Sequence, residues 1–223
     1  MFIGRARELD FLQERYDSER AELVVLYGRR RIGKTELLQQ FARDKAAVFY
    51  ACTECTDQEQ LARFSKRILQ TGLPAARFLT AFSDWETALR SIQEVPSEGK
   101  KLLIIDEFPY MCASHPELPS ILQNLWDHEL SRANVMLILC GSAMSFIENE
   151  LLAERNPLYG RATGIYKLLP LPFVSVREFF PQYSVEDQVA VYAILGGIPY
   201  YLIQFQSEKS LEENIRTNIL QKG

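Results

Sequence analysis

Residues 28–35 read Gly-Arg-Arg-Arg-Ile-Gly-Lys-Thr, and they constrain the fold more than any other part of this sequence. The segment fits the pattern G-x-x-x-x-G-K-[ST], which describes a loop whose backbone N–H groups surround a phosphate chain. Gly28 and Gly33 permit a tight turn that side chains would obstruct. Lys34 can reach the outer phosphates, and the Thr35 hydroxyl can ligate Mg²⁺.

The residues on either side of this loop predict a strand before it and a helix after it. Residues 23–27 are a short apolar run that ends at a glycine, which is typical of a buried strand. Residues 35–43 place Leu37, Leu38 and Phe41 at helical spacing. Strand, loop and helix in this order are the context that the pattern requires, and the helix N-terminus adds a positive dipole end under the phosphates. The alternative is a glycine turn with an exposed basic patch.

A second apolar run, residues 102–105, is followed directly by Asp106 and Glu107. Such a run is typical of a central parallel strand covered on both faces, and carboxylates at its C-terminal end would lie where open α/β sheets bind ligands. Asp106 fits the Mg²⁺-coordinating acid of P-loop nucleotide hydrolases, and Glu107 is placed to orient or deprotonate the attacking water. The alternative is a strand that ends in a solvated acidic turn.

A third apolar run, residues 135–140, is followed by Gly141 and Ser142. In additional-strand P-loop ATPases, a strand between the loop strand and the acid strand carries at its tip a polar residue that senses the γ-phosphate. Ser142 occupies that position. Serine is also a preferred N-cap, so Ser142 could instead begin a helix over residues 143–150, and the two roles are compatible.

With 223 residues, the chain suits one large α/β domain with room for a small appendage. Its hydrophobic content of 47% and charged content of 24% are ordinary for a soluble globular protein, and the net charge of −4 gives no whole-protein reason to expect nucleic acid. No apolar run approaches the length of about 18 residues that a membrane span needs, and the N-terminus lacks a secretory signal. Together with the cysteine usage, these features predict a cytoplasmic protein with no membrane partner.

Cys52 and Cys55 have C-x-x-C spacing after a strand-like run at residues 47–51. No second pair of this kind and no paired histidine lies nearby, so a four-ligand zinc site would lack half of its ligands. Ordinary packing is therefore favoured over redox or metal use.

Five strand candidates alternate with helix candidates up to residue 170, and the last of them is residues 165–168. Pro170 and Pro172 mark a boundary, after which short helices are expected over residues 175–180, 185–195 and 200–205. We therefore expect a core of residues 1–170 and a small helical region of residues 171–223. Capping boxes predict four helix starts, at Thr56, Ser83, Ser175 and Ser210.

Five motifs, taken in order, resemble the archaeal-type ATPase family of the AAA+/STAND group. They are residues 2–5 with Glu8 and Leu9, the phosphate-binding loop, residues 102–107, Gly141 with Ser142, and residues 196–199. Residues 156–161 also resemble the motif that precedes the last strand in that family. The resemblance spans essentially the whole chain. It implies a P-loop NTPase fold in three α/β/α layers, a parallel sheet in the order 5-1-4-3-2, and a small C-terminal helical lid.

The resemblance also implies which residues contact ATP or ADP. Residues 2–5 would contact the adenine or ribose, although from the residues alone a simple helix start is the favoured interpretation. Pro199 would approach the base, although glycine and proline there also suit a turn. The expected nucleotide contacts are Phe2, Ile3, Gly4, Arg5, Gly28, Arg31, Ile32, Gly33, Lys34, Thr35, Glu36 and Pro199, and the expected Mg²⁺ ligands are Thr35 and Asp106.

Several arginines are candidates for further contacts. Arg161 lies between a helix and the fifth strand, where related ATPases place an arginine that stabilises γ-phosphate charge within one chain or across a subunit interface. A salt-bridged surface arginine is the alternative, and Arg155 is a weaker candidate. Arg29, Arg30 and Arg31 could contact phosphate, an acidic group of a partner or DNA, or form a solvated basic face.

These residues predict an Mg²⁺-dependent ATPase whose nucleotide state controls the lid, with Glu107, Lys34, Ser142 and Arg161 as the catalytic set. The alternative is a STAND-like switch that binds ATP or ADP with negligible turnover and regulates a DNA-binding or nuclease partner domain. A GTPase is disfavoured because the sequence holds no Asn-Lys-x-Asp segment. The resemblance implies longer relatives, so we expect the chain to end before a winged-helix or further C-terminal domain. That domain, DNA and a second copy of the chain are the candidate partners.

Overall fold

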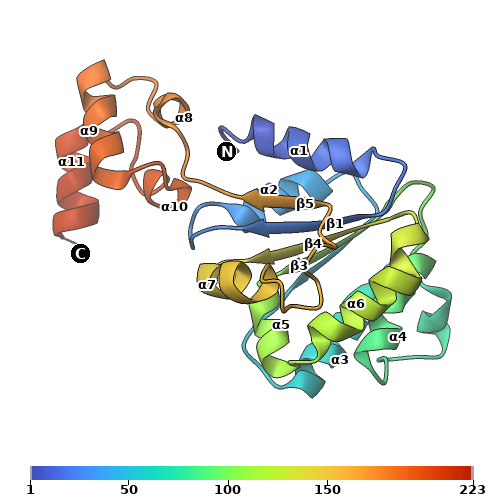
Figure 1. Ribbon diagram of the computed structural model, residues 1–223. Coiled ribbons are helices and arrows are strands. Elements are labelled where there is room, and N and C mark those ends of the chain that lie inside the picture. Colours follow the sequence, from blue (N-terminus) through green and yellow to red (C-terminus); the bar gives the residue numbers. More distant parts are fainter. Residues whose placement is uncertain (1, 222–223) are drawn as a thin grey trace.

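The computed structural model describes residues 2–221, which contain a five-stranded sheet whose paired strands are all parallel (Figure 1). The strands lie in the order β2-β3-β4-β1-β5, which is the expected order 5-1-4-3-2 counted from the other edge. The predicted three-layer α/β fold is therefore confirmed. The strand bounds are β1 Glu22–Tyr27, β2 Ala47–Ala51, β3 Lys101–Asp106, β4 Val135–Gly141 and β5 Gly164–Lys167.

The three central strands, β1, β3 and β4, are almost entirely buried, as their apolar sequences predicted. In β1, Val24 and Leu26 pack with the helices α1 (Ala6–Tyr16) and α2 (Lys34–Ala42), whereas Leu23 and Val25 pack with the helices on the other face. Successive strand side chains point to opposite faces, so a sheet of this composition needs a helical layer on each side. Figure 1 shows α1 and α2 above the sheet and α3 to α6 below it.

The lower helical layer carries the apolar stripes that helical spacing predicted. Phe64 lies with its ring 5.3 Å from that of Tyr50 on β2 and 5.5 Å from that of Trp85, centroid to centroid. These helices are α3 Asp57–Leu69, α4 Trp85–Arg90, α5 Phe108–Ser114 and α6 Leu118–His128, and α7 Met144–Phe146 follows β4. Short 3₁₀ or π turns occur at Pro74–Arg77, Ser91–Glu94, Leu130–Arg132, Ile147–Leu151 and Arg216–Leu220. Within residues 2–221, no helix combines the length and the apolar character needed to cross a bilayer.

The last four helices form a small layer beyond the carboxyl ends of the strands, and we call residues 171–221 the lid (Figure 1). The helices are α8 Phe173–Phe179, α9 Val185–Leu195, α10 Pro199–Leu202 and α11 Leu211–Ile215. They share an apolar cluster of their own, made of Leu171, Val176, Phe180, Val191, Leu202 and Phe205. The division of the chain at residue 170 stays a prediction, and residues 222–223 of the expected helical region lie outside the described residues.

Two of the four predicted helix starts are confirmed. Ser210 and Glu213 form a complete capping box at the start of α11, in which each side chain accepts a hydrogen bond from the backbone N–H of the other residue. Thr56 accepts a hydrogen bond from the N–H of Glu59 at the start of α3. Both therefore satisfy a backbone donor that the helix cannot satisfy itself.

The other two predicted starts are wrong. Helix α4 begins one residue later than Ser83 implied, because the carboxylate of Asp84 accepts the hydrogen bond from the Thr87 N–H. Ser175 lies inside α8, whose N-cap is Pro172. Proline there ends the extended segment and leaves Ser175 free to pack in the interior, where it is 5% exposed.

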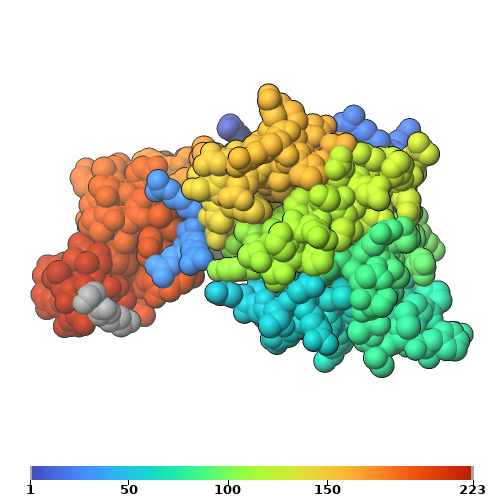
Figure 2. Space-filling view, turned by 60° about the horizontal axis from the view of Figure 1, so that its bottom comes forward, coloured from blue at the N-terminus to red at the C-terminus, as the bar shows by residue number. Residues whose placement is uncertain are grey.

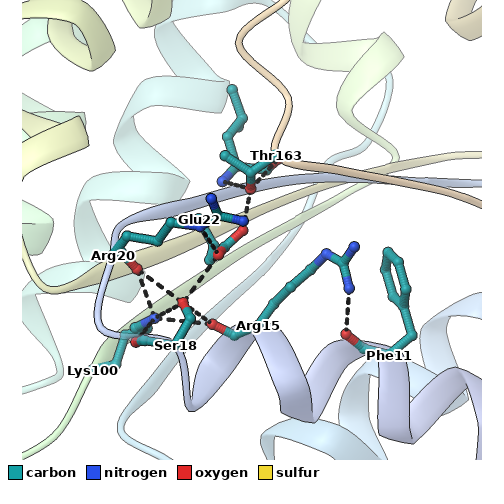
Figure 3. Close-up of polar contacts among 8 residues, drawn as sticks. Phe11, Arg15, Ser18, Arg20, Glu22, Lys100 and Thr163 are labelled. Carbon is teal, nitrogen blue, oxygen red and sulfur yellow. Dashed lines mark hydrogen bonds and ion pairs between the residues drawn. The ribbon is translucent and has the colours of Figure 1, made fainter.

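The amino end of the sheet is closed by a buried polar network (Figure 3). The Lys100 ammonium donates hydrogen bonds of 2.7 to 2.9 Å to three backbone carbonyl groups. One belongs to Arg15 in the last turn of α1, and the other two belong to Ser18 and Arg20, just after that helix. Glu22, at the start of β1, is fully buried. Its carboxylate accepts hydrogen bonds from three side chains, those of Ser18, Arg20 and Thr163. Because an unpaired buried charge is costly, these contacts hold α1, β1 and the segment before β5 together.

Candidate active site

The phosphate-binding loop joins β1 to α2 at the carboxyl edge of the sheet. Gly33 is the N-cap of α2 and has a φ of 88°, a left-handed conformation that glycine adopts without steric cost. Lys34 is buried, and its Nζ donates hydrogen bonds to the carbonyl oxygens of Gly28 at 3.0 Å and Arg29 at 3.1 Å. The loop thus folds around its own ammonium group, next to the positive end of the α2 dipole. This concentrates positive charge where the sequence predicted phosphates.

Asp106, the last residue of β3, lies beside Thr35 in the first turn of α2. The Thr35 hydroxyl donates to Oδ2 of Asp106 at 2.5 Å, and the N–H of Glu107 donates to Oδ1 at 3.0 Å. A hydroxyl and a carboxylate oxygen in contact suit Mg²⁺, which takes oxygen ligands and is commonly held by one or two carboxylates together with substrate phosphates. The structure therefore brings together the two residues predicted as Mg²⁺ ligands.

Glu107 follows Asp106 in a left-handed conformation, with a φ of 53°. Such backbone strain in a residue other than glycine is concentrated at functional sites. Oε2 of Glu107 accepts hydrogen bonds from the hydroxyl of Ser142 at 2.9 Å and from its N–H at 3.1 Å. Gly141 allows this approach, because a Cβ there would lie 2.8 Å from Cδ of Pro109. The alternative role of Ser142 as a helix cap is wrong, since α7 begins after Ala143 without a side-chain cap.

A pocket of about 680 Å³ opens between the loop, the N-terminal segment and the lid. In Figure 2 the medium-blue part of the chain, which includes the loop, lies between the orange lid and the yellow and green part of the core. The volume lies within the usual range for small-molecule sites. The pocket is lined by Phe2, Ile3, Arg5, Arg30, Arg31, Ile32, Gly33, Lys34, Thr35, Glu36, Glu107, Tyr110, Phe179, Pro199, Tyr200 and Ile203. The N-terminal segment and the lid supply most of the apolar lining, and the loop supplies most of the charge.

Four of these lining residues were missed by sequence reasoning, and they are Tyr110, Phe179, Tyr200 and Ile203. Tyr110 follows Glu107 by three residues, and its N–H donates to the carbonyl of Glu107, so a turn after the acid strand could have suggested it. Phe179, Tyr200 and Ile203 belong to the lid, where the sequence pattern does not tell which helix face meets the core.

Arg5, which was expected to contact the base or ribose, is instead held by contacts within the protein. Its side chain is 4% exposed, and its guanidinium donates to the carbonyl oxygens of Ile32 and Leu169, both at 2.9 Å, and to Glu8 at 2.7 Å. It therefore ties the phosphate-binding loop to the segment before the lid while also lining the pocket. Gly4 does not line the pocket, and a Cβ on it would lie 2.5 Å from Oγ of Ser175.

Arg161 lies apart from the pocket. Its guanidinium makes two hydrogen bonds to the carboxylate of Asp127 on α6, at 2.6 and 2.8 Å. It also donates to the carbonyl oxygens of Pro157 at 2.8 Å and Tyr159 at 3.3 Å. The hydrogen bond from Arg161 lowers the pKa of Asp127. Within this chain Arg161 thus forms a surface ion pair, which was the alternative interpretation of this residue. A role for Arg161 across a subunit interface stays a prediction.

Arg31 connects the loop to the lid. It has a φ of 71°, and its guanidinium lies 4.6 Å from the ring centre of Tyr200 and 5.6 Å from that of Tyr201. It also donates to the Tyr201 hydroxyl at 3.0 Å, and the Tyr200 N–H donates to the Arg31 carbonyl at 3.4 Å. A strained residue of the phosphate-binding loop therefore carries the contact with α10.

The two cysteines of the C-x-x-C segment lie in different surroundings. Cys52 is buried, and burial, followed by the nearby Asp106 carboxylate, raises the pKa of its thiol, so the thiol stays protonated near neutral pH. Cys55 is free and partly exposed. Across residues 2–221, no group of three or more His, Cys, Asp or Glu side chains could hold a metal ion by itself.

The strand order, the loop and the acid at the end of β3 define a P-loop ATPase domain. A family described as an ATPase domain predominantly from Archaea matches residues 2–205. An uncharacterized protein of Methanocaldococcus jannaschii is 35% identical over 202 residues, which are 91% of this chain and 43% of that protein. The chain belongs to this archaeal ATPase family, and it spans less than half the length of that curated relative. An uncharacterized ATP-binding protein of the same organism is 47% identical over 45 residues, 20% of this chain and 76% of its own.

Solved structures share the fold. The Walker-type ATPase PABY2304 of Pyrococcus abyssi has a TM-score of 0.78 at 20% identity and covers 96% of this chain, which in turn covers 71% of it. The ORC2 protein of Aeropyrum pernix, in its ADPNP and ADP complexes, has a TM-score of 0.61 at 15% identity, with 91% and 62% covered. A STAND protein of Pyrococcus horikoshii with a tetratricopeptide repeat sensor has a TM-score of 0.58 at 20% identity, with 96% and 32% covered.

Proposed function

We propose that this ATPase domain binds ATP together with Mg²⁺ in the pocket, hydrolyses it, and uses its nucleotide state to set the position of the lid. One observation carries the proposal. A single pocket is lined by the phosphate-binding loop, by Glu107 and by Tyr200 of the lid, directly beside the hydrogen-bonded pair of Thr35 and Asp106.

The polar groups that the sequence predicted as catalytic or metal-binding, apart from Arg161, each have a role in this reaction. Lys34 and the loop N–H groups bind the β- and γ-phosphates, and Thr35 and Asp106 would hold Mg²⁺, which would supply further positive charge there. Glu107 orients a water molecule and accepts its proton as the water oxygen bonds to the γ-phosphorus. The bond from that phosphorus to the β–γ bridging oxygen breaks, and ADP leaves with the electron pair. Ser142 senses the γ-phosphate, and its hydrogen bonds to Glu107 couple that contact to the position of the Glu107 carboxylate.

The apolar lining supports a base site. Phe2 and Ile3 from the N-terminus and Pro199 from the lid form an apolar part of the pocket lining. We assign the flat adenine ring to this part of the pocket. Because the base would touch both the core and the lid, nucleotide binding would favour a lid position in which both sides are in contact.

The proposal is tested by nucleotide binding and turnover of the purified chain with Mg²⁺. Lys34→Ala should abolish ATP binding, because the cation that faces the outer phosphates is lost. Glu107→Gln should keep binding and lower turnover roughly 100-fold or more, because an amide cannot accept the proton. Arg43→Ala is the matched control, since Arg43 is exposed at the end of α2 away from the pocket. Turnover by Glu107→Gln at the wild-type rate would show that the role assigned to Glu107 is wrong.

A second function, a nucleotide-bound switch with negligible turnover, is favoured by the two hydrogen bonds that occupy Glu107. While Ser142 holds one of its carboxylate oxygens, Glu107 is less available to a water molecule. Turnover measured at a low and a high protein concentration separates the two functions. Absence of turnover at both concentrations, with tight ADP or ATP binding, would favour the switch. Turnover that appears only at high concentration would point to a homo-oligomer in which a neighbouring chain completes the site.

The proposal also covers the partner on which the lid acts. The curated relative is more than twice as long as its matched region, and one structural neighbour, the ORC1 protein of Aeropyrum pernix, is described in complex with DNA. DNA or a C-terminal effector domain is therefore our candidate for what the lid moves or releases.

A further inference from the structure

We propose that Arg30, in the phosphate-binding loop, is a catalytic arginine that stabilises the charge of the γ-phosphoryl group within its own chain. This role rests on the proposed ATP hydrolysis and names the residue that would supply the missing positive charge. Phosphoryl transfer spreads negative charge over the transferred group, and an arginine that meets this charge is among the strongest contributions to the rate.

The surroundings of the arginines single out Arg30. Three arginines line the described pocket. Arg5 is buried against two carbonyl groups and Glu8, and Arg31 is held by the two lid tyrosines. Arg161 does not line the pocket and is paired with Asp127. Arg30 is the one pocket arginine that no carboxylate and no lid residue holds among residues 2–221.

Arg30 rests on a neutral partner at the catalytic end of the pocket. Its Nη2 donates to the hydroxyl of Tyr110 at 3.1 Å, and both side chains line the pocket with Glu107 and Thr35. The Tyr110 N–H donates to the carbonyl of Glu107 at 3.0 Å, so the phenol belongs to the same turn as the residue assigned to the water. Arg30, Tyr110, Glu107 and Thr35 therefore line the same pocket.

The resting contact is weak enough to be exchanged. A phenol is an uncharged acceptor, whereas a terminal phosphate is doubly charged and accepts hydrogen bonds roughly twice as strong. Arg30 is exposed, so its side chain can turn without breaking the core. We infer that Arg30 leaves Tyr110 when a γ-phosphate is present and stays there when only ADP is bound.

Arg30 does not alter which bonds form and break during ATP hydrolysis. The water oxygen bonds to phosphorus, the bond to the bridging oxygen breaks, and the leaving ADP keeps the electron pair. Arg30 neither gains nor loses a proton, because its guanidinium stays charged. Its contribution is the positive charge next to the γ-phosphoryl oxygens as the bond to ADP breaks.

The test compares the affinities for ADP and for a nonhydrolysable ATP analogue by calorimetry, alongside turnover. Arg30→Ala should lower kcat roughly 100-fold or more. It should lower the preference for the analogue over ADP roughly 10-fold, the factor that one hydrogen bond to a charged group supplies. Arg30→Lys should restore part of the preference, because it keeps the charge and loses the fork geometry. Arg43→Ala again serves as the charge-matched control.

Tyr110→Phe separates this role from a structural one. Removing the phenol acceptor should raise the preference for the analogue over ADP by a few-fold, because Arg30 no longer gives up a hydrogen bond to reach the γ-phosphate. If Arg30 and Tyr110 only brace the loop, both substitutions should lower the melting temperature and leave that preference unchanged, which would overturn the assignment. Wild-type turnover and preference in Arg30→Ala would also overturn it. A wild-type chain that binds neither nucleotide would overturn the proposed function itself.

Discussion

Both donors of Ser142, its hydroxyl at 2.9 Å and its N–H at 3.1 Å, reach the same carboxylate oxygen of Glu107. The two residues follow adjacent parallel strands, β3 and β4, so the ends of these strands meet at one edge of the sheet. Glu107 has a left-handed backbone conformation at this strand end, with a φ of 53°. A change at Ser142 should therefore alter Glu107, the residue to which we assign the attacking water, without touching the predicted phosphate-binding loop.

If the chain hydrolyses ATP as proposed, Ser142→Ala should lower ATP turnover roughly 10-fold or more and leave ADP affinity nearly unchanged. The hydroxyl that positions the Glu107 carboxylate is lost, while the backbone N–H of residue 142 is kept. Steady-state kinetics together with ADP titration measure both quantities. Ser142→Thr, which keeps a hydroxyl, is the matched control. Equal losses in the two variants would contradict a role for the hydroxyl.

Arg31→Met should loosen α10 of the lid. The substitution keeps most of the side-chain length and removes the guanidinium that lies over Tyr200 and donates to Tyr201. Loss of about 1 kcal/mol of contact should speed amide exchange of Tyr200, Tyr201 and Leu202 about five-fold. Hydrogen–deuterium exchange with and without ADP measures this.

Arg216→Met is the control for the lid experiment, because Arg216 is an exposed lid residue whose guanidinium pairs with Glu212 of its own helix turn. Exchange in α10 that stays at the wild-type rate in Arg31→Met would show that the loop does not hold the lid.

Gly197→Ala should disrupt the joint between the lid helices and the segment that leads into them. A Cβ on Gly197 would lie 1.8 Å from the carbonyl oxygen of Leu171, and the Leu171 N–H donates to the Gly197 carbonyl at 2.7 Å. The backbone must move apart, at a cost of about 1 to 3 kcal/mol. Denaturant unfolding measures the loss. Gly99→Ala is the control, because a Cβ there would lie 3.8 Å from the Tyr16 hydroxyl, which is an ordinary contact distance. Equal stability of both variants would contradict the close approach.

We expect the fold to lose stability in acid when the Glu22 carboxylate becomes protonated. Burial raises the pKa of Glu22, but hydrogen bonds from Thr163, Arg20 and Ser18 outweigh it, and the net pKa lies below its ordinary value of 4.5. A lowered pKa in the folded state contributes stability above pH 4.5 that is lost as the pH falls through the folded pKa. Figure 3 shows the contacts that protonation would weaken.

Glu22→Gln should therefore be less stable than wild type at pH 7 by about 1 to 3 kcal/mol, with a smaller difference in acid. Urea unfolding at both pH values measures the two differences. Glu19→Gln is the control, since Glu19 is exposed beside the network. A difference between Glu22→Gln and wild type that stays constant down to the acid limit would contradict this account.

The grouping of these residues at the carboxyl edge could be predicted from the sequence because each part is local. Lys34, Thr35, Asp106, Glu107 and Ser142 each follow an apolar strand or open the next helix, and parallel strands bring their carboxyl ends to one edge. The predicted order of strands follows from the family, and the pairing of β1 with β4 and β5 agrees with it.

The contacts of the arginines were not readable in the same way. Arg31 reaches Tyr201 over 170 positions of sequence, Arg161 turns to Asp127, and Arg30 turns to Tyr110. Long, charged side chains find their partners only after the backbone has placed several candidates within reach, so spacing along the chain carries little information about them.

The sequence by itself determined the phosphate-binding loop, the acidic strand end and the α/β class, because apolar periodicity and glycine positions act over a few residues. Only the tertiary structure decided which lid face meets the pocket, that Arg5 ties the loop to the segment before the lid, and that Arg161 lies apart from the pocket. These outcomes depend on how the lid's small apolar cluster sits against the core, and that depends on packing between segments far apart in the chain.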